Sequence, residues 1–180
     1  MMKTKKLVIT AMFTAVQCVL SVVSFPVGAV PVTLSVLGVF LIGSLLSPVA
    51  AVSAELVYIT IGAIGLPVFS GFSSGLGTLF GPTGGYLMAY PIMAFAVAYA
   101  AKRFERHRTA ALCVSMAFSL AVCYVLGTAW FCTVTKSTFS HALAVCVAPF
   151  VPFDLIKAAA AVAVSTAADH TPLRRLLREV

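Results

Sequence analysis

The chain has 180 residues, of which 61% are hydrophobic, and its charged side chains are limited to 12 Lys or Arg and 5 Asp or Glu. A soluble domain of this length needs far more polar surface, so the mean hydropathy of +1.08 predicts an integral membrane protein. The net charge of +7 does not indicate nucleic-acid binding, because basic residues that flank membrane spans on the cytoplasmic side give the same excess.

The first apolar run, residues 7–23, follows Lys3, Lys5 and Lys6. This order resembles a secretory signal peptide, and residues 27–29 could serve as its cleavage site. However, a helix of this length nearly crosses a bilayer core of about 30 Å. We therefore expect an uncleaved first membrane span.

Five further apolar runs complete an expected all-α bundle of six transmembrane helices in a single membrane domain, residues 1–180. The spans are expected at about 7–23, 33–46, 49–66, 85–101, 110–130 and 152–168. Residues 137–151 are also apolar, but Pro149 and Pro152 would interrupt one continuous helix through this region. We expect a short outer helix or lid there, followed by a last span that begins at Pro152, since proline suits the first helical position.

Basic residues predict the orientation of these spans. The segments before span one, between spans four and five, and after span six hold ten of the twelve Lys and Arg residues, and the outer loops hold only Lys136. The positive-inside rule then predicts cytoplasmic termini. The ten residues are Lys3, Lys5, Lys6, Lys102, Arg103, Arg106, Arg108, Arg174, Arg175 and Arg178.

Residues 62–86, which include an outer loop at 67–84, hold eight of the twelve glycines. Irregular backbone at membrane depth is tolerated where protein buries it or where it lines a cavity. Phe69, Phe72 and Tyr86 could supply apolar walls for a small ligand. The free backbone N–H groups of Gly84 and Gly85, just after Thr83, could hold an anion at the start of span four. The segment is expected to form the wall and gate of a binding pocket.

Asp154 and Lys157 are the most informative polar pair. They lie three residues apart in an apolar span, so on a helix they share a face. Ionisable residues inside a membrane span usually face the bundle interior or a wet cavity. The pair could form a structural salt bridge or contact a ligand, and we favour the ligand. Glu55 is equally compatible with a structural role, a partner contact and ligand binding, and is left out of the predicted site.

Other motifs are weaker. Residues 71–75 match the G-x-S-x-G pattern of serine hydrolases, but the strand and helix that this motif requires are absent. The five cysteines form no C-x-x-C pair, so neither a disulfide nor a metal site is expected, and no cofactor is expected. The chain has no phosphate-binding motif for ATP. Ala11 and Ala15 form a small-x-x-x-small pattern that would let another membrane helix approach closely.

Three segments together resemble the BioY family, the biotin-binding S components of energy-coupling-factor transporters. They are Gly62-Ala63-Ile64-Gly65-Leu66-Pro67-Val68-Phe69, Gly81-Pro82-Thr83-Gly84-Gly85-Tyr86-Leu87 and Pro152-Phe153-Asp154-Leu155-Ile156-Lys157. The resemblance implies a multi-pass protein of the bacterial cytoplasmic (inner) membrane that captures biotin near its outer face and performs no catalysis. It also implies docking, through Ala11 and Ala15, to a transmembrane coupling subunit that is bound to two ATPases, without nucleic acid.

The resemblance implies that Asp154 and Lys157 contact biotin, whose ureido ring offers two N–H donors and a carbonyl and whose tail ends in a carboxylate. Which end of biotin each residue meets is left open. Family members often carry an amide side chain in the segment after Phe69, whereas residues 70–74 of this chain contain no Asn or Gln and offer serines instead. The predicted substrate-binding residues are Asp154, Lys157, Tyr86, Thr83, Gly84, Gly85, Phe69, Phe72, Ser73 and Ser74. Two alternatives remain: a solitary or dimeric biotin transporter that works without ATPases, and a serine hydrolase that uses Ser73 or Ser74 with His141.

Overall fold

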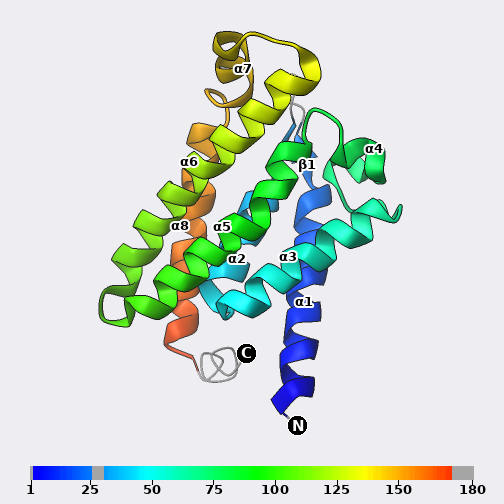
Figure 1. The fold of residues 1–180 in the computed structure, drawn as a ribbon. Coiled ribbons are helices and arrows are strands. Elements are labelled where there is room, and N and C mark those ends of the chain that lie inside the picture. Colours follow the sequence, from blue (N-terminus) through cyan, green and yellow to red (C-terminus); the bar gives the residue numbers. More distant parts are fainter. Residues whose placement is uncertain (1, 26–30, 172–180) are drawn as a thin grey trace.

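The structure, a computed structural model, describes residues 2–25 and 31–171. Within these residues, four helices are long and apolar enough to cross a membrane: α1 (Met2–Val22), α5 (Gly84–Arg103), α6 (Arg108–Thr135, with the preceding turn) and α8 (Val151–Asp169). Two shorter apolar helices, α2 (Ser35–Leu45) and α3 (Pro48–Ala63), complete the bundle (Figure 1). The chain is therefore a helical multi-pass membrane protein.

Helix α5 lies at the centre of this bundle. It packs against α2, α3 and α6, while α1 packs on α2 and α3, and α8 packs on α2 and α6. Phe40, Ile42, Met93 and Val97 are fully or almost fully buried between these helices. An apolar helix that is covered on several sides is typical of a bundle core.

The two ends of the bundle differ in charge (Figure 1). The start of α1, the α2–α3 turn and the α5–α6 connection lie at one end, and β1, α4 and α7 lie at the other. The first end holds the basic residues of the α1 start, the last turn of α5, the short 3₁₀ turn η2 (Glu105–His107) and the α6 start, whereas Lys136 follows α6 at the other end. Arg174, Arg175 and Arg178 lie outside the described residues.

Helix boundaries follow the local sequence signals. The Ser47 hydroxyl caps α3 by accepting the N–H of Ala50 at 3.4 Å, and Pro48 occupies the first turn. Pro152 likewise lies in the first turn of α8, as predicted. Residues 137–151 form the predicted short helix, α7 (Phe139–Cys146), instead of a membrane span.

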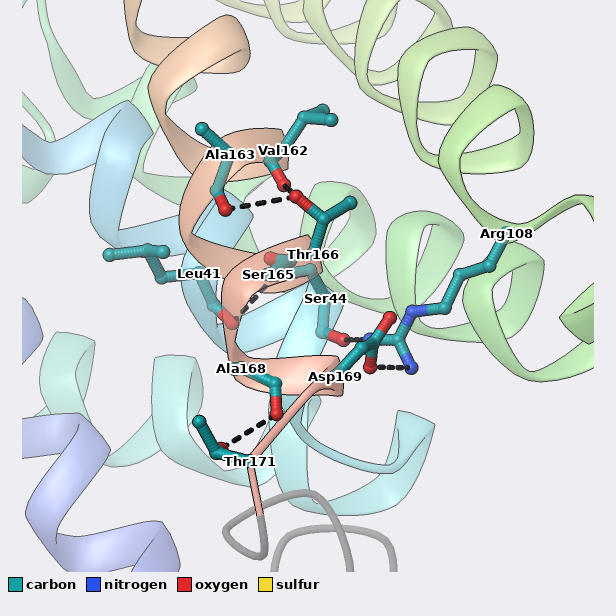
Figure 2. A network of polar contacts seen from close by, with 10 residues as sticks. All are labelled: Leu41, Ser44, Arg108, Val162, Ala163, Ser165, Thr166, Ala168, Asp169 and Thr171. Carbon is teal, nitrogen blue, oxygen red and sulfur yellow. Dashed lines mark hydrogen bonds and ion pairs between the residues drawn. The ribbon is translucent and has the colours of Figure 1, made fainter.

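A polar network ties three helices together at the basic end (Figure 2). The Arg108 guanidinium, at the start of α6, lies 3.2 Å from the Asp169 carboxylate at the end of α8. The same side chain donates to the Ser44 carbonyl at the end of α2, and the Ser44 and Ser165 hydroxyls hydrogen-bond to each other. One guanidinium therefore joins α2, α6 and α8 and holds these three helices together at this end of the bundle.

The opposite end is built from short elements. Strands β1 (Ser24–Phe25) and β2 (Val32–Thr33) form a two-stranded antiparallel ribbon. The glycine-rich segment adds the 3₁₀ turn η1 (Ser70–Phe72) and the one-turn helix α4 (Leu76–Leu79), and α7 lies nearby (Figure 1). Short elements that cover the ends of long helices are a common setting for a binding site.

Candidate binding site

A cavity opens between the helices and the short elements at the end opposite the basic residues. Together with the space that is open to solvent, it encloses about 700 Å³. Its wall is mostly aromatic and apolar with a few polar groups. The lining residues are Pro31, Thr33, Ser35, Val36, Tyr58, Phe69, Ser70, Thr78, Thr83, Tyr86, Leu87, Tyr90, Cys123, Tyr124, Cys146, Phe150, Asp154 and Lys157.

Asp154 and Lys157 lie side by side in the wall of this cavity, on the first turns of α8. The Lys157 ammonium contacts Oδ1 of Asp154 at 2.6 Å. The side chain of Lys157 is only 8% exposed and that of Asp154 only 4%. The Tyr124 hydroxyl, from α6, donates to Oδ2 of the same carboxylate at 2.7 Å. Asp154 and Lys157 therefore form a salt bridge with each other and at the same time line the cavity.

This arrangement leaves hydrogen-bonding capacity for a ligand. A carboxylate has about four acceptor sites, and Lys157 and Tyr124 use one each at Asp154. The ammonium has three donors, of which one is used here. The pair can therefore accept from ligand N–H groups and donate to a ligand carbonyl or carboxylate within a low-dielectric wall, where such contacts are strong.

The Tyr124 hydroxyl orients Asp154, and we expect its removal to destabilise the protein. Replacing Tyr124 by Phe leaves a buried carboxylate oxygen without its donor, which costs about 1–3 kcal/mol. The thermal unfolding midpoint of the purified protein should fall by several degrees. The matched control is Tyr99→Phe, since Tyr99 is exposed and stacks on Phe95. Equal midpoints for Tyr124→Phe and Tyr99→Phe would contradict this role.

Aromatic packing forms another part of the wall. The rings of Tyr58 and Phe69 meet edge to face, with centroids 5.6 Å apart and planes at 82°. Gly62 makes room for Phe69, because a Cβ at this position would lie 2.1 Å from Cζ of the ring. Gly75 donates its N–H to the Gly62 carbonyl at 2.7 Å, which folds the glycine-rich segment back onto α3. The segment thus delivers Phe69 to the cavity.

Five of the ten predicted binding residues line the cavity: Phe69, Thr83, Tyr86, Asp154 and Lys157. The pair on α8 and the residues of the glycine-rich segment come from distant parts of the sequence. Their convergence was expected from the resemblance to the BioY family and not from any single local motif.

Three other predicted residues lie away from the cavity wall. Phe72 is 70% exposed, and Ser73 donates its hydroxyl hydrogen to the Ser70 carbonyl at 2.8 Å. Ser74 does not line the cavity either; Ser70 does. Binding by Phe72, Ser73 and Ser74 stays a prediction. The histidine of the hydrolase alternative, His141, is exposed on α7 and does not line the cavity.

Gly84 and Gly85 pack against protein in this structure. A Cβ at Gly84 would lie 1.7 Å from the Leu79 carbonyl oxygen, and one at Gly85 would lie 2.3 Å from Cβ of Trp130. The indole Nε1 of Trp130 donates to the Gly81 carbonyl at 2.9 Å. Gly84 therefore lets the end of α4 approach the start of α5, and Gly85 lets α5 approach α6. An anion-binding role for the two glycines stays a prediction.

Sequence reasoning missed several lining residues. Cys123 and Tyr124 on α6 and Tyr90 on α5 face the cavity, but each lies in an apolar run without a local signal of its own. A helical stripe was available on α6, where buried residues recur every three or four positions. Thr33 and Ser35 also line the cavity, and their hydroxyls lie 2.8 Å apart.

Comparisons with known proteins agree with these features. The model of the BioY family matches residues 1–173. The chain is 37% identical to the probable biotin transporter BioY of Pyrococcus horikoshii over 91% of this chain and 96% of that protein. It is 36% identical to biotin transporter BioY2 of Lactococcus lactis, over 87% and 85%, and 37% identical to biotin transporter BioY of Thermotoga maritima, over 85% and 89%.

The fold also has a counterpart among solved structures. The crystal structure of an S-component for biotin from an ECF-type ABC transporter superposes with a TM-score of 0.87, covering 98% of this chain and 97% of that chain at 24% identity. This likeness concerns the fold. The family match over nearly the whole chain, with relatives above 30% identity, establishes that this chain belongs to the BioY family.

Proposed function

We propose that this chain is the substrate-binding membrane subunit of an energy-coupling-factor transporter and captures biotin at the outer face for ATP-driven uptake. One observation carries the proposal: a buried Asp154–Lys157 pair lies in the wall of an aromatic cavity in a member of the BioY family. Its relatives are named biotin transporters, and no catalytic step is needed for capture.

The chemistry of the wall suits biotin. Asp154 would accept from the ureido N–H groups, and Lys157 would donate to the ureido carbonyl or to the tail carboxylate. Tyr58, Tyr86 and Phe69 offer apolar surface to the fused rings and the aliphatic tail. The hydroxyls of Ser70 and Thr83 are available in place of the amide side chain that many family members carry.

The orientation in the membrane follows from charge. We propose that the whole chain forms one membrane domain, that α1, α2, α3, α5, α6 and α8 all cross the cytoplasmic membrane, and that both termini are cytoplasmic. The concentration of basic residues at one end of the bundle supports this orientation. The cavity then opens to the outside, where free biotin arrives.

Energy for uptake would come from partners. The sequence has no phosphate-binding motif for ATP, so we propose a transmembrane coupling subunit that carries two ATPases. Ala11 and Ala15 lie on an exposed, apolar side of α1, which supports helix packing against such a subunit.

Large side chains at the proposed docking face of α1 should prevent binding of the coupling subunit. Replacing Ala11 and Ala15 together by Trp prevents close helix approach, so we expect the coupling subunit to be lost from affinity-purified complexes. Biotin binding by the isolated chain should remain, because neither residue lines the cavity. The control replaces Met12 and Val16, exposed residues on the neighbouring side of α1, by Trp. Undiminished co-purification of the Ala11/Ala15 variant would contradict the docking face.

Direct binding tests the main proposal. The purified chain is titrated with biotin, desthiobiotin and thiamine, and we expect tight binding of biotin and none of thiamine. Biotin amide, which lacks the carboxylate, tests which end of the ligand Lys157 meets. Absence of biotin binding would refute the proposal. Uptake in cells that lack the coupling and ATPase subunits would instead favour a solitary or dimeric transporter.

A further inference from the structure

The side of helix α1 that packs into the bundle carries a polar stripe beside the partly buried Ile9, Phe13 and Cys18. The three described α1 side chains that are almost completely buried are Thr14, Gln17 and Ser21, which follow one another at spacings of three and four residues. The other side of the helix presents exposed apolar side chains, including Met12 and Val19. The most deeply buried side chains of α1 are therefore polar and its outward side is apolar, the reverse of the pattern of a water-soluble protein.

This stripe meets a carboxylic acid on α3. The Thr14 hydroxyl donates to the Ala54 carbonyl oxygen on α3 at 3.2 Å. Glu55 follows Ala54 on α3 and is 0% exposed. Neither of its carboxylate oxygens has a hydrogen-bond partner among the described residues, and no described Lys or Arg forms an ion pair with it.

A buried carboxylate without a partner is costly when it is ionised, by several kcal/mol even after relaxation, and it becomes neutral instead. We propose that Glu55 is a proton-binding site, and that it holds its proton as long as α1 is seated against α3. The ligand of this site is a proton from water, and the site is separate from the cavity, because Glu55 does not line it.

The surroundings of Glu55 favour the neutral acid. The titratable groups that interact with it are Cys18 on α1, Tyr58 on its own helix and Tyr90 on α5, all of which are neutral or become anionic. None of them can compensate a negative charge by supplying a positive one. Ionisation would therefore require water to enter between α1 and α3, so raising the pH should weaken the packing of α1, and lowering the pH should strengthen it.

Infrared spectroscopy tests the proton directly. The protein is purified in a detergent without ester groups, and the C=O stretch of protonated carboxyl groups, which shifts in heavy water, is recorded at neutral pH. We expect a band that is present in the wild type, absent in Glu55→Gln and retained in Glu105→Gln, whose side chain is exposed. A wild-type spectrum identical to that of Glu55→Gln in this region would overturn the proposal.

Thermal unfolding against pH gives an independent readout. Glu55→Gln imitates the neutral acid, so its midpoint should equal that of the wild type in mild acid and exceed it by several degrees in alkali. The Glu105→Gln control should show no such gain over the wild type in alkali. A Glu55→Gln midpoint well below the wild type at every pH would show an ionised, paired carboxylate and overturn the proposal. Neither measurement involves biotin, so both remain valid if the proposed substrate is wrong.

Discussion

Biotin binding should weaken strongly when Lys157 is replaced by alanine. The ammonium lies in a wall that excludes most solvent and is proposed to donate to biotin, so the substitution leaves a buried ligand oxygen without its charged donor. Truncation of one partner of such a pair costs about 2–5 kcal/mol. At 1.4 kcal/mol per tenfold, the dissociation constant should rise by about 30-fold to several thousand-fold, as measured by titration calorimetry. Asp154→Asn should have an effect in the same range.

Controls separate this effect from unfolding. Lys157→Arg keeps the charge and should retain more affinity than Lys157→Ala, and Lys136→Ala removes an exposed lysine at the same end of the bundle without changing binding. The double variant of Asp154 and Lys157 should lose less than the sum of the single losses, because the two residues share one interaction. Unchanged affinity in the folded single variants would remove the pair from the site.

The second large effect is expected at Gly84. A methyl group there would lie 1.7 Å from the Leu79 carbonyl oxygen, so Gly84→Ala must push α4 away from the start of α5. Overpacking of this kind costs about 1–3 kcal/mol. The thermal midpoint should fall, and biotin binding should weaken as well because Thr83 and Tyr86, next to Gly84 in sequence, line the cavity.

Gly77→Ala is the matched control for Gly84→Ala. Gly77 lies in α4, and a Cβ there would meet no atom within 4 Å. Because alanine is the better helix former by about 1 kcal/mol, this variant should be as stable as the wild type or slightly more so. If both substitutions destabilised the protein equally, the cause would be general sensitivity of the segment, and the close contact with Leu79 would not be the reason.

Much of the helical layout could be predicted from the sequence because apolar runs and prolines give strong local signals. The short helix between residues 137 and 151 is confirmed, and the last helix begins at Val151, one residue before the predicted Pro152. The shared face of Asp154 and Lys157 is confirmed too, since it follows from helical spacing alone. The count of six spans remains a prediction, because α2 and α3 are short for spanning helices.

The details of the cavity wall could not be predicted, because they depend on contacts between distant segments. The glycines were expected to bring backbone close to a ligand, and several of them instead admit other parts of the protein. Gly62 admits the Phe69 ring, and Gly127 on α6 admits the ring of Tyr86. Similarly, nothing near Tyr124 in sequence indicates that its hydroxyl reaches Asp154, which is 30 residues away.

The position of Trp130 has a practical consequence. It is the single tryptophan of the chain, and its indole is hydrogen-bonded to Gly81 and packed against Gly85. Tryptophan emission from this protein therefore originates at one place, the junction between α6 and the glycine-rich segment that carries Thr83. The indole is therefore an intrinsic fluorescent probe, and stopped-flow fluorescence can test, without any label, whether this segment moves when a ligand binds.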